Sequence, residues 1–235
     1  ADHDAHSKRI FDANDWRSYE ISEAQIKASR RAYFANISYL DDKIGGILDV
    51  LEMTGQEATI LFVSDHGDML GERGLWFKMS FFEGAARVPL MIAAPEMAPG
   101  VVTAPVSTID ICPTLCNLAG ISMAEVMPWT HGESLVPLAS GGARRQAVAM
   151  EYAAEASYAP LVSLCSGWWK YIRCALDPEQ LFNLETDPHE LCNLASNPQY
   201  AKILQDLRDQ SHALWDLDRF DAEIRESQAR RWVIY

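Results

Sequence analysis

Three side chains that can take part in chemistry lie in the stretch from Thr59 to Lys78. The apolar run Ile60–Val63 leads directly into Asp65 and His66, and Lys78 lies in the loop that follows. A carboxylate beside an imidazole offers one hard oxygen and one borderline nitrogen to a divalent cation. A lysine ammonium in the same neighbourhood suits a charged oxygen of a substrate. These residues therefore predict a metal-binding site that acts on an anion.

The elements around these residues would place them at the edge of a sheet. Ile60–Val63 is short, apolar and bounded by polar residues, which is typical of a strand buried on both faces. In an open parallel sheet, loops at the carboxyl ends of the strands line the ligand crevice. Gly67 lets the backbone turn away there without a side-chain clash. As a bare tripeptide, Asp65-His66-Gly67 is about equally compatible with a hydrogen-bonded turn that has no chemical role.

The composition is that of a packed globular protein. Of 235 residues, 49% are hydrophobic and 23% are charged. The formal net charge of −13 argues against nucleic acid as a partner, because phosphate binding needs a basic face. The negative charge suits a cationic ligand, but the need of any protein to stay soluble explains the charge equally well. No apolar run reaches the length of a membrane span and no signal segment opens the chain, so we expect a cytoplasmic protein without a membrane partner.

The cysteines predict neither a disulfide framework nor a zinc site. Their odd number, without close pairs, favours reduced thiols. No histidine or second pair completes a zinc site around the two that could share a helix face. We expect all of them to be small buried hydrophobic residues: Cys112, Cys116, Cys165, Cys174 and Cys192.

The first half of the chain predicts a long helix and a second strand. Ser22 and Gln25 have the spacing of a capping box, and Gly55 is a typical helix end. Between them, apolar residues follow the helical period and predict one buried stripe: Ile26, Tyr33, Ile37, Leu40, Ile44, Ile47, Leu48 and Leu51. Val88–Ala93 is a second apolar run. Helix and strands together indicate an α/β layer fold.

The amino-terminal stretch, residues 1–19, is polar and lacks periodicity. His3 and His6 could suggest metal binding, but two histidines in a mobile acidic leader are more often solvated. A chain that opens without a signal or a first strand is expected to be the middle of a longer polypeptide.

The second half predicts a smaller antiparallel subdomain in residues 146–235, after an α/β domain in residues 1–145. The expected elements are one strand, the two strands of a hairpin, an amphipathic helix and a charged terminal segment: Ala147–Tyr152, Leu161–Cys165, Trp168–Arg173, Pro198–Trp215 and Leu217–Tyr235. The terminal segment is interpreted either as a cover for a partner chain or as a surface helix.

Several strings resemble the sulfatase family of the alkaline-phosphatase superfamily. They are S-D-H-G-D-M-L-G-E-R-G-L-W-F-K with the following F-E, R-V-P-L and A-P, then T-I-D-I-C-P-T-L-C-N-L-A-G-I and Q-L-F-N-L-E-T-D-P-H-E-L-C-N-L. The likeness covers nearly the whole chain, but only the carboxy-terminal half of a sulfatase, and is nearest to the choline sulfatases. It implies part of an alkaline-phosphatase-like mixed or parallel sheet between helices, followed by the antiparallel β subdomain with its packed helix.

The resemblance implies roles for three residues. Asp65 and His66 would be ligands of a divalent cation, with Ca²⁺ favoured although Mn²⁺ or Mg²⁺ fits about as well. Lys78 would be the catalytic lysine that contacts the sulfate and neutralises charge on the leaving oxygen. The family nucleophile is a formylglycine made from cysteine in a Cys-x-Pro-x-Arg type motif, and none of the cysteines here stands in one: Cys112 is followed by P-T-L. We therefore expect the nucleophile on a missing amino-terminal part or another chain, and this chain alone to be inactive.

Choline would need a separate binding group. Aromatic faces and a carboxylate can hold a quaternary ammonium by cation–π attraction and charge pairing. The string M-E-Y-A-A-E-A-S-Y-A-P supplies Glu151, Tyr152, Glu155 and Tyr158 after a strand. We favour Glu155, further into the loop, over Glu151 in the strand, and both are equally compatible with being surface carboxylates.

The function implied is hydrolysis of a sulfate ester, choline sulfate, to choline and sulfate. The alternatives are a phosphonate monoester or phosphodiester hydrolase of the same superfamily, and a non-catalytic module that assembles with other subunits. The expected partners are a small sulfate ester, the missing amino-terminal half or a partner chain, and further copies of this chain in a homo-oligomer.

Overall fold

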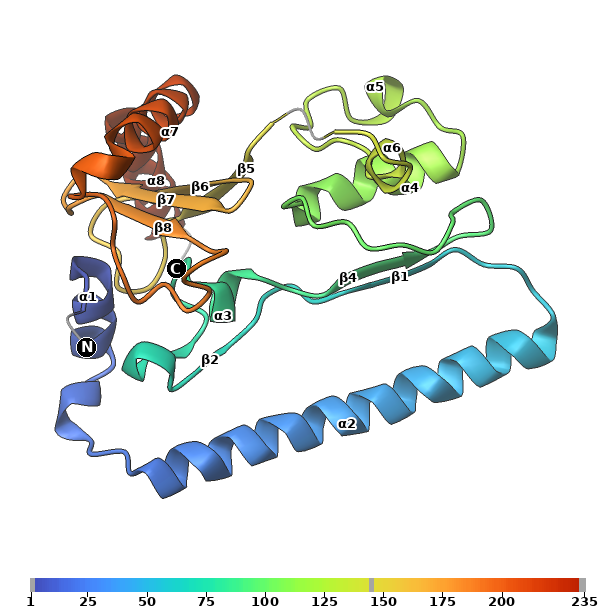
Figure 1. The fold of residues 1–235 in the computed structure, drawn as a ribbon, viewed down its shortest axis with the longest axis horizontal. Helices are drawn as coiled ribbons and strands as arrows, with labels where there is room; N and C mark the ends of the chain where they lie inside the picture. Colours follow the sequence, from blue (N-terminus) through green and yellow to red (C-terminus); the bar gives the residue numbers. More distant parts are fainter. Residues whose placement is uncertain (1–2, 144–145, 233–235) are drawn as a thin grey trace.

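In a computed structural model, which describes residues 3–143 and 146–232, the chain forms a mixed α/β fold with antiparallel sheets (Figure 1). The α-helices are α1 Ala5–Ala13, α2 Glu23–Thr54, α3 Glu83–Ala86, α4 Ile111–Leu118, α5 Met123–Val126, α6 Val136–Ala139, α7 Ala201–Leu214 and α8 Leu217–Trp232. The short 3₁₀ helices are η1 Trp16–Ser18, η2 Glu72–Gly74, η3 Thr108–Asp110 and η4 Pro198–Tyr200. The strands are β1 Ile60–Val63, β2 Met69–Leu70, β3 Trp76–Phe77, β4 Leu90–Ala93, β5 Val148–Tyr152, β6 Leu161–Ser166, β7 Trp169–Cys174 and β8 Gln180–Asn183.

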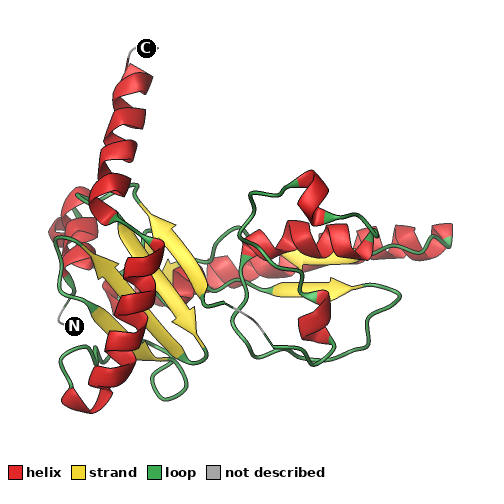
Figure 2. Cartoon of the chain, turned by 90° about the horizontal axis from the view of Figure 1, so that it is seen from above, coloured by secondary structure: helices red, strands yellow, loops and turns green. Residues whose placement is uncertain are grey.

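A four-stranded antiparallel sheet, in the order β5-β6-β7-β8, forms the better-packed half of the molecule. Leu164 pairs with Tyr171, which pairs with Leu181, so these three side chains share one face of the sheet. Leu204 and Leu207 of α7 pack against that face. Figure 2 shows a helix lying across the sheet while α8 projects away from it. The expected antiparallel subdomain with a packed helix is confirmed.

The opposite face of the sheet is covered by residues from the first half of the chain. Leu161, Ile172 and Phe182 form one apolar cluster with Ile10 of α1 and with residues of the segment from β2 to α3: Met69, Leu75, Phe81, Phe82 and Ala85. One core therefore joins residues on both sides of the predicted boundary. That boundary, at residue 145, falls outside the described residues, and the division into two domains stays a prediction.

The amino-terminal leader is a docked helix, which corrects the expectation of a mobile, solvated segment. Ile10 of α1 is 1% exposed, and Arg9 forms two hydrogen bonds of 2.7 and 2.5 Å to the Asp177 carboxylate. His6 is also buried, and its Nε2 lies 2.7 Å from the Met79 carbonyl. Burial lowers the pKa of His6, so the ring is neutral and Nε2 donates. The helix is too short to show a clear apolar period in the sequence, which explains the wrong prediction.

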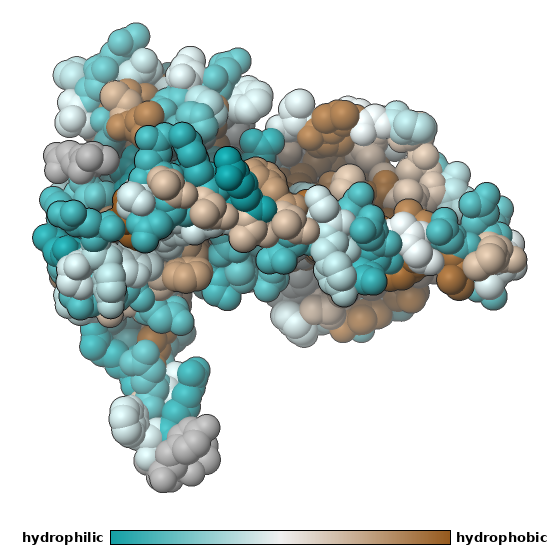
Figure 3. All heavy atoms as spheres, turned by 90° about the horizontal axis from the view of Figure 1, so that it is seen from below, coloured by the Kyte–Doolittle hydropathy of each residue, from teal (hydrophilic) through white to brown (hydrophobic). Residues whose placement is uncertain are grey.

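Helix α2 has the predicted ends but not the predicted burial. The Ser22 side chain and Gln25 form a capping box, and Gly55 ends the helix in the left-handed region. None of the α2 residues is buried, and Ile47 is 69% exposed, so the predicted buried stripe is wrong. Figure 3 shows apolar side chains at the surface of the half of the molecule that carries α2. No helix in the described ranges is long and apolar enough to cross a membrane.

Strand β1 pairs with β4 in antiparallel orientation, with Val63 opposite Leu90. All four β1 residues are partly exposed, so the expectation of a strand buried on both faces is wrong. The strand pairings described here are all antiparallel, which corrects the expectation of parallel neighbours at this strand. Burial on both faces would require covering layers, and α2 contributes no buried residue to one.

Candidate functional site

The loop after β1 is shaped by short local hydrogen bonds and by one close backbone contact. The Ser64 hydroxyl donates to the His66 carbonyl at 2.8 Å, and the His66 amide donates to Asp65 Oδ1 at 2.9 Å. The Gly67 amide donates to the Ala85 carbonyl at 2.8 Å. A Cβ at Gly67 would lie 2.3 Å from the Gly84 carbonyl oxygen, a distance no side chain tolerates. The glycine thus lets the loop seat directly on α3.

Asp65, His66 and Lys78 converge on one point. Lys78 Nζ lies 2.9 Å from His66 Nε2, and Asp65 Oδ2 lies 3.5 Å from the same nitrogen. His66 Nδ1 is 2.8 Å from the Gly67 carbonyl, an acceptor only, so Nδ1 carries the proton of the neutral ring. The Nε2 lone pair is therefore directed at the Lys78 ammonium and at the space the three side chains share.

The electrostatics of this group favour an ionised carboxylate that is open to solvent. The His66 amide hydrogen bond, with Lys78 nearby, holds the pKa of Asp65 below its usual value, and the Asp65 side chain is 84% exposed. One carboxylate and one imidazole lone pair suit a divalent cation. In the described part of the chain, no group of three His, Cys, Asp or Glu residues could hold a metal ion.

The two carboxylates considered for choline lie in different settings. Glu151 is in β5, as expected, and accepts a 2.6 Å hydrogen bond from the Trp215 indole. Glu155 is exposed in the following loop and accepts a 3.2 Å hydrogen bond from the Tyr152 hydroxyl. Burial, with the nearby Glu155 carboxylate, raises the pKa of Tyr152 above its usual value. No hydrogen bond or ion pair of the described residues joins Glu155 to the Asp65–His66–Lys78 group.

Comparison with known proteins assigns the chain to a family. The sulfatase family profile matches residues 2–121, and a profile for the carboxy-terminal part of N-sulphoglucosamine sulphohydrolase matches residues 71–216. The chain belongs to the sulfatase family. Together the two matches extend over most of this sulfatase sequence, including Asp65, His66 and Lys78.

The most informative relatives are all about twice as long as this sulfatase chain. It is 59% identical to a choline-sulfatase of Rhizobium meliloti (strain 1021), over 99% of this chain but 46% of the relative. It is 36% identical to arylsulfatase K of Danio rerio, over 81% of this chain and 38% of the relative. A phosphonate monoester hydrolase of Silicibacter pomeroyi superposes with a TM-score of 0.72 at 28% identity, covering 84% of this chain and 43% of that one.

Two buried side chains to which the sequence analysis gave no role at this site hold the loop that carries Lys78. His6 of α1 donates to the Met79 carbonyl, and Lys170 of β7 donates to the Phe81 carbonyl at 2.8 Å. A lysine inside an otherwise apolar strand, G-W-W-K-Y-I, was the available signal for the second contact. The signal could show that Lys170 needs a buried partner, but not which loop supplies it.

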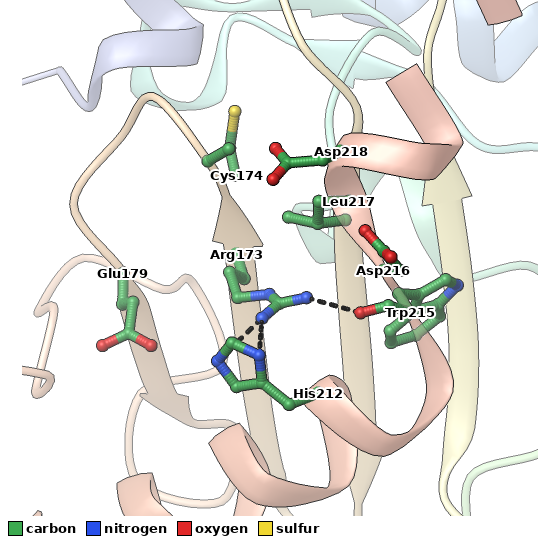
Figure 4. Close-up of a pocket in the computed structure, with 9 residues that line it drawn as sticks. Arg173, Cys174, Glu179, His212, Trp215, Asp216, Leu217 and Asp218 are labelled. Atoms are coloured by element: carbon green, nitrogen blue, oxygen red, sulfur yellow. Dashed lines mark hydrogen bonds between the residues drawn. The ribbon is translucent and has the colours of Figure 1, made fainter. Parts of the chain in front are cut away.

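A pocket of about 590 Å³ lies apart from this group, at the junction of β7, α7 and α8 (Figure 4). Its lining residues are Arg173, Cys174, Ala175, Glu179, His212, Trp215, Asp216, Leu217 and Asp218. Arg173 Nη1 lies 2.7 and 2.8 Å from the two His212 ring nitrogens, and Nη2 donates to the Trp215 carbonyl at 3.2 Å. A guanidinium and several carboxylates share the lining, so its charge favours no one ligand class. The candidate site rests on the converging side chains near β1, not on this pocket.

Proposed function

We propose that this chain supplies the carboxy-terminal half of a sulfate ester hydrolase that acts on choline sulfate. The observation that carries the proposal is that Lys78 Nζ and Asp65 Oδ2 lie 2.9 and 3.5 Å from the same nitrogen, His66 Nε2. All three residues fall within the match to the sulfatase profile. The relative with 59% identity is named a choline-sulfatase, which supports the substrate.

In this proposal, Asp65 and His66 hold a divalent cation, for which Ca²⁺ is our choice over Mn²⁺ and Mg²⁺. The Gly67 carbonyl fixes the tautomer that leaves His66 Nε2 without a proton, an arrangement common among metal-binding histidines. That lone pair faces Lys78 Nζ at 2.9 Å, so a bound cation would take the place of the ammonium beside Nε2. When bound, such a cation would draw negative charge from the sulfate oxygens. The Lys78 ammonium contributes hydrogen-bond donors and a positive charge beside the same oxygens. The remaining ligands and the formylglycine nucleophile are proposed to lie outside these 235 residues.

We also propose that Glu155 and Tyr152 contribute to the choline pocket. A quaternary ammonium has no hydrogen to donate, so a carboxylate and an aromatic ring are the groups that attract it. Tyr152 lies beside the active-site loop, because its ring packs edge-on against Phe81 at 6.3 Å between centroids. The Tyr152 hydroxyl lies 3.0 Å from the Glu155 carbonyl and 3.2 Å from Glu155 Oε2, so it would hold Glu155 near that loop through its backbone as well as its carboxylate.

Replacing Lys78 tests the catalytic role proposed for it. In a polypeptide that joins this chain to a sulfatase amino-terminal half, Lys78→Ala should lower kcat for choline sulfate by roughly a hundredfold or more, because a fixed cation is lost where charge develops. Sulfate release is the measurement, and Lys43→Ala, at an exposed lysine of α2, is the control. The present chain alone should release no sulfate. A kcat for Lys78→Ala equal to that of the parent enzyme would refute the role.

Replacing the glutamate tests the substrate. Glu155→Gln should raise KM for choline sulfate about tenfold and leave KM for an uncharged aryl sulfate unchanged, since only choline carries the cation. Equal effects on both esters would remove Glu155 from the choline pocket.

A phosphonate monoester hydrolase is the second candidate, favoured by the TM-score of 0.72 to a protein of that name. The same assay distinguishes the two functions. Higher kcat/KM on a phenyl phosphonate monoester than on choline sulfate would favour the second candidate.

A further inference from the structure

One lysine of the C-terminal sheet is completely buried and yet fully hydrogen-bonded. Lys170 is 0% exposed, and its Nζ lies 2.8 Å from the Phe81 carbonyl, 2.6 Å from Glu83 Oε1 and 2.8 Å from Glu190 Oε1. An ammonium has three hydrogens, so each one has an acceptor. Burial alone would lower the pKa of Lys170, but the facing Glu190 and Glu83 carboxylates outweigh burial and raise it. The side chain is therefore a charged three-way link between β7, α3 and the loop after β8.

Glu190 extends this link to the rest of the active-site loop. Its second carboxylate oxygen accepts a 2.6 Å hydrogen bond from the Glu83 amide, and its backbone carbonyl accepts one from the Arg73 guanidinium. Arg73 also stacks over the Phe82 ring, 4.2 Å from its centroid. Both Glu190 and Arg73 have a φ of 54°, in the left-handed region that residues with a side chain rarely adopt. Such backbone persists only where surrounding contacts determine it.

Helix α3 connects the Lys170–Glu190 cluster to the loops of the candidate site. Lys170 and Glu190 hold its first residue, Glu83, from the side of the sheet. From the other side, the Gly67 amide donates to Ala85, and the chain passes from Gly67 directly back to His66. Lys78 lies a few residues before Phe81, whose carbonyl is one of the Lys170 acceptors. The short helix therefore has the buried cluster on one side and the Asp65–His66 loop on the other.

We propose that Lys170 and Glu190 are positioning residues, which set the geometry of Asp65, His66 and Lys78 through α3. The proposal rests on the function proposed above only in taking those three residues as the site. A buried ion pair adds little stability over apolar residues of similar volume, so stability alone does not account for it. An ammonium that reaches three fixed acceptors does determine how α3 sits on the sheet.

The test uses this chain as it is and needs no turnover. Lys170→Met keeps the length of the side chain and removes the ammonium. Backbone amides of residues 66–69 and 79–86 should then exchange with deuterium about tenfold faster or more, because α3 loses its anchor. Amides of β6 and β7 should keep their protection. The imidazole ¹⁵N shifts of His66 should move from the Nδ1–H tautomer towards a mixture of tautomers, since the loop no longer fixes the ring.

The matched control is Arg208→Met, which breaks a partly buried pair of the same subdomain. The Arg208 guanidinium bonds to Glu179 and Gln205 and not to α3. It should lower stability without changing the His66 shifts or the exchange of α3. If Lys170→Met does not fold, Glu190→Gln replaces it, since this change keeps an acceptor for Lys170 and removes the one for the Glu83 amide.

The proposal is overturned if α3 and His66 are unchanged in a folded Lys170→Met or Glu190→Gln chain, or if Arg208→Met changes them equally. Failure of the function proposal looks different, because choline sulfate turnover would be absent in the joined polypeptide while these spectra still respond. Where turnover is present, Lys170→Met should lower kcat about a hundredfold, a cost typical of a small misplacement of catalytic groups.

Discussion

The half of the molecule built on β5–β8 and the half that carries α2, β1 and β4 contain similar sequence signals but differ in burial. The inner residues of β6 and β7 are almost all buried, and both faces of their sheet are covered. In the other half, β1 is partly exposed along its whole length and α2 buries none of its residues. An apolar stripe in the sequence therefore shows that a surface could be buried, but it does not show whether another part of the protein covers that surface.

This difference in burial also means that the two halves support the candidate site differently. Its loop is fixed from the well-packed half, through His6, Lys170 and Glu190. The strand that presents Asp65 belongs to the other half. There, Arg30 of α2 donates to the Leu70 carbonyl at 2.9 Å, but no α2 residue is buried. The relatives that the chain matches are about twice as long as this chain.

We expect the largest difference in stability between an alanine substitution at a leucine of the packed half and one at an isoleucine of α2. Leu181→Ala should lower the free energy of unfolding by about 2–5 kcal/mol, because Leu181 is 0% exposed and a cavity would remain. Ile47→Ala should change it by less than about 0.5 kcal/mol, since Ile47 is 69% exposed. Urea denaturation of this chain measures both. Similar costs for the two variants would mean that α2 is covered in solution and would break the comparison.

A smaller effect tests whether α1 belongs to the packed half. Arg9→Met leaves the buried Asp177 carboxylate without its two charged hydrogen bonds, which should cost about 1.5–3 kcal/mol. Arg17→Met is the control, because the Arg17–Asp12 pair is exposed and such pairs contribute about 0–1 kcal/mol. Urea denaturation at pH 7 compares the two variants. Equal costs would show that α1 is not docked as described.

The stability that the Arg9–Asp177 pair contributes should depend on pH. Burial would raise the pKa of Asp177, but the Arg9 hydrogen bonds outweigh burial and hold it below its usual value. A carboxylate with a lowered folded-state pKa contributes stability that is present above its unfolded value, about 3.9, and lost as the pH falls through the folded value. The difference between the parent chain and Arg9→Met should therefore shrink below about pH 4.

Several parts of the fold could be predicted because their causes are local. The ends of α2 follow from Ser22, Gln25 and Gly55, whose side chains and backbone act within a few residues of the helix end. The β6–β7 hairpin follows from two apolar runs around Ser166-Gly167, and Gly167 has the positive φ of 56° that this turn needs. The predictions of a mobile leader, a buried α2 stripe, a β1 strand buried on both faces and parallel neighbours for that strand were wrong. All of them concern contacts with residues outside the element itself. Ile10 is buried by the far end of the chain, whereas the α2 stripe meets no such surface.

The sequence by itself predicted the longer helices and strands and the family, and it named Asp65, His66 and Lys78 as candidates, because caps, turns and family motifs lie in neighbouring positions of the chain. Only the tertiary structure decided that Lys78 meets His66, and that Lys170 and Glu190 meet Glu83 beneath them. The Lys170 and Glu190 contacts join segments far apart in the chain. Their geometry depends on how the loop packs between α1 and the C-terminal sheet, which no local pattern records.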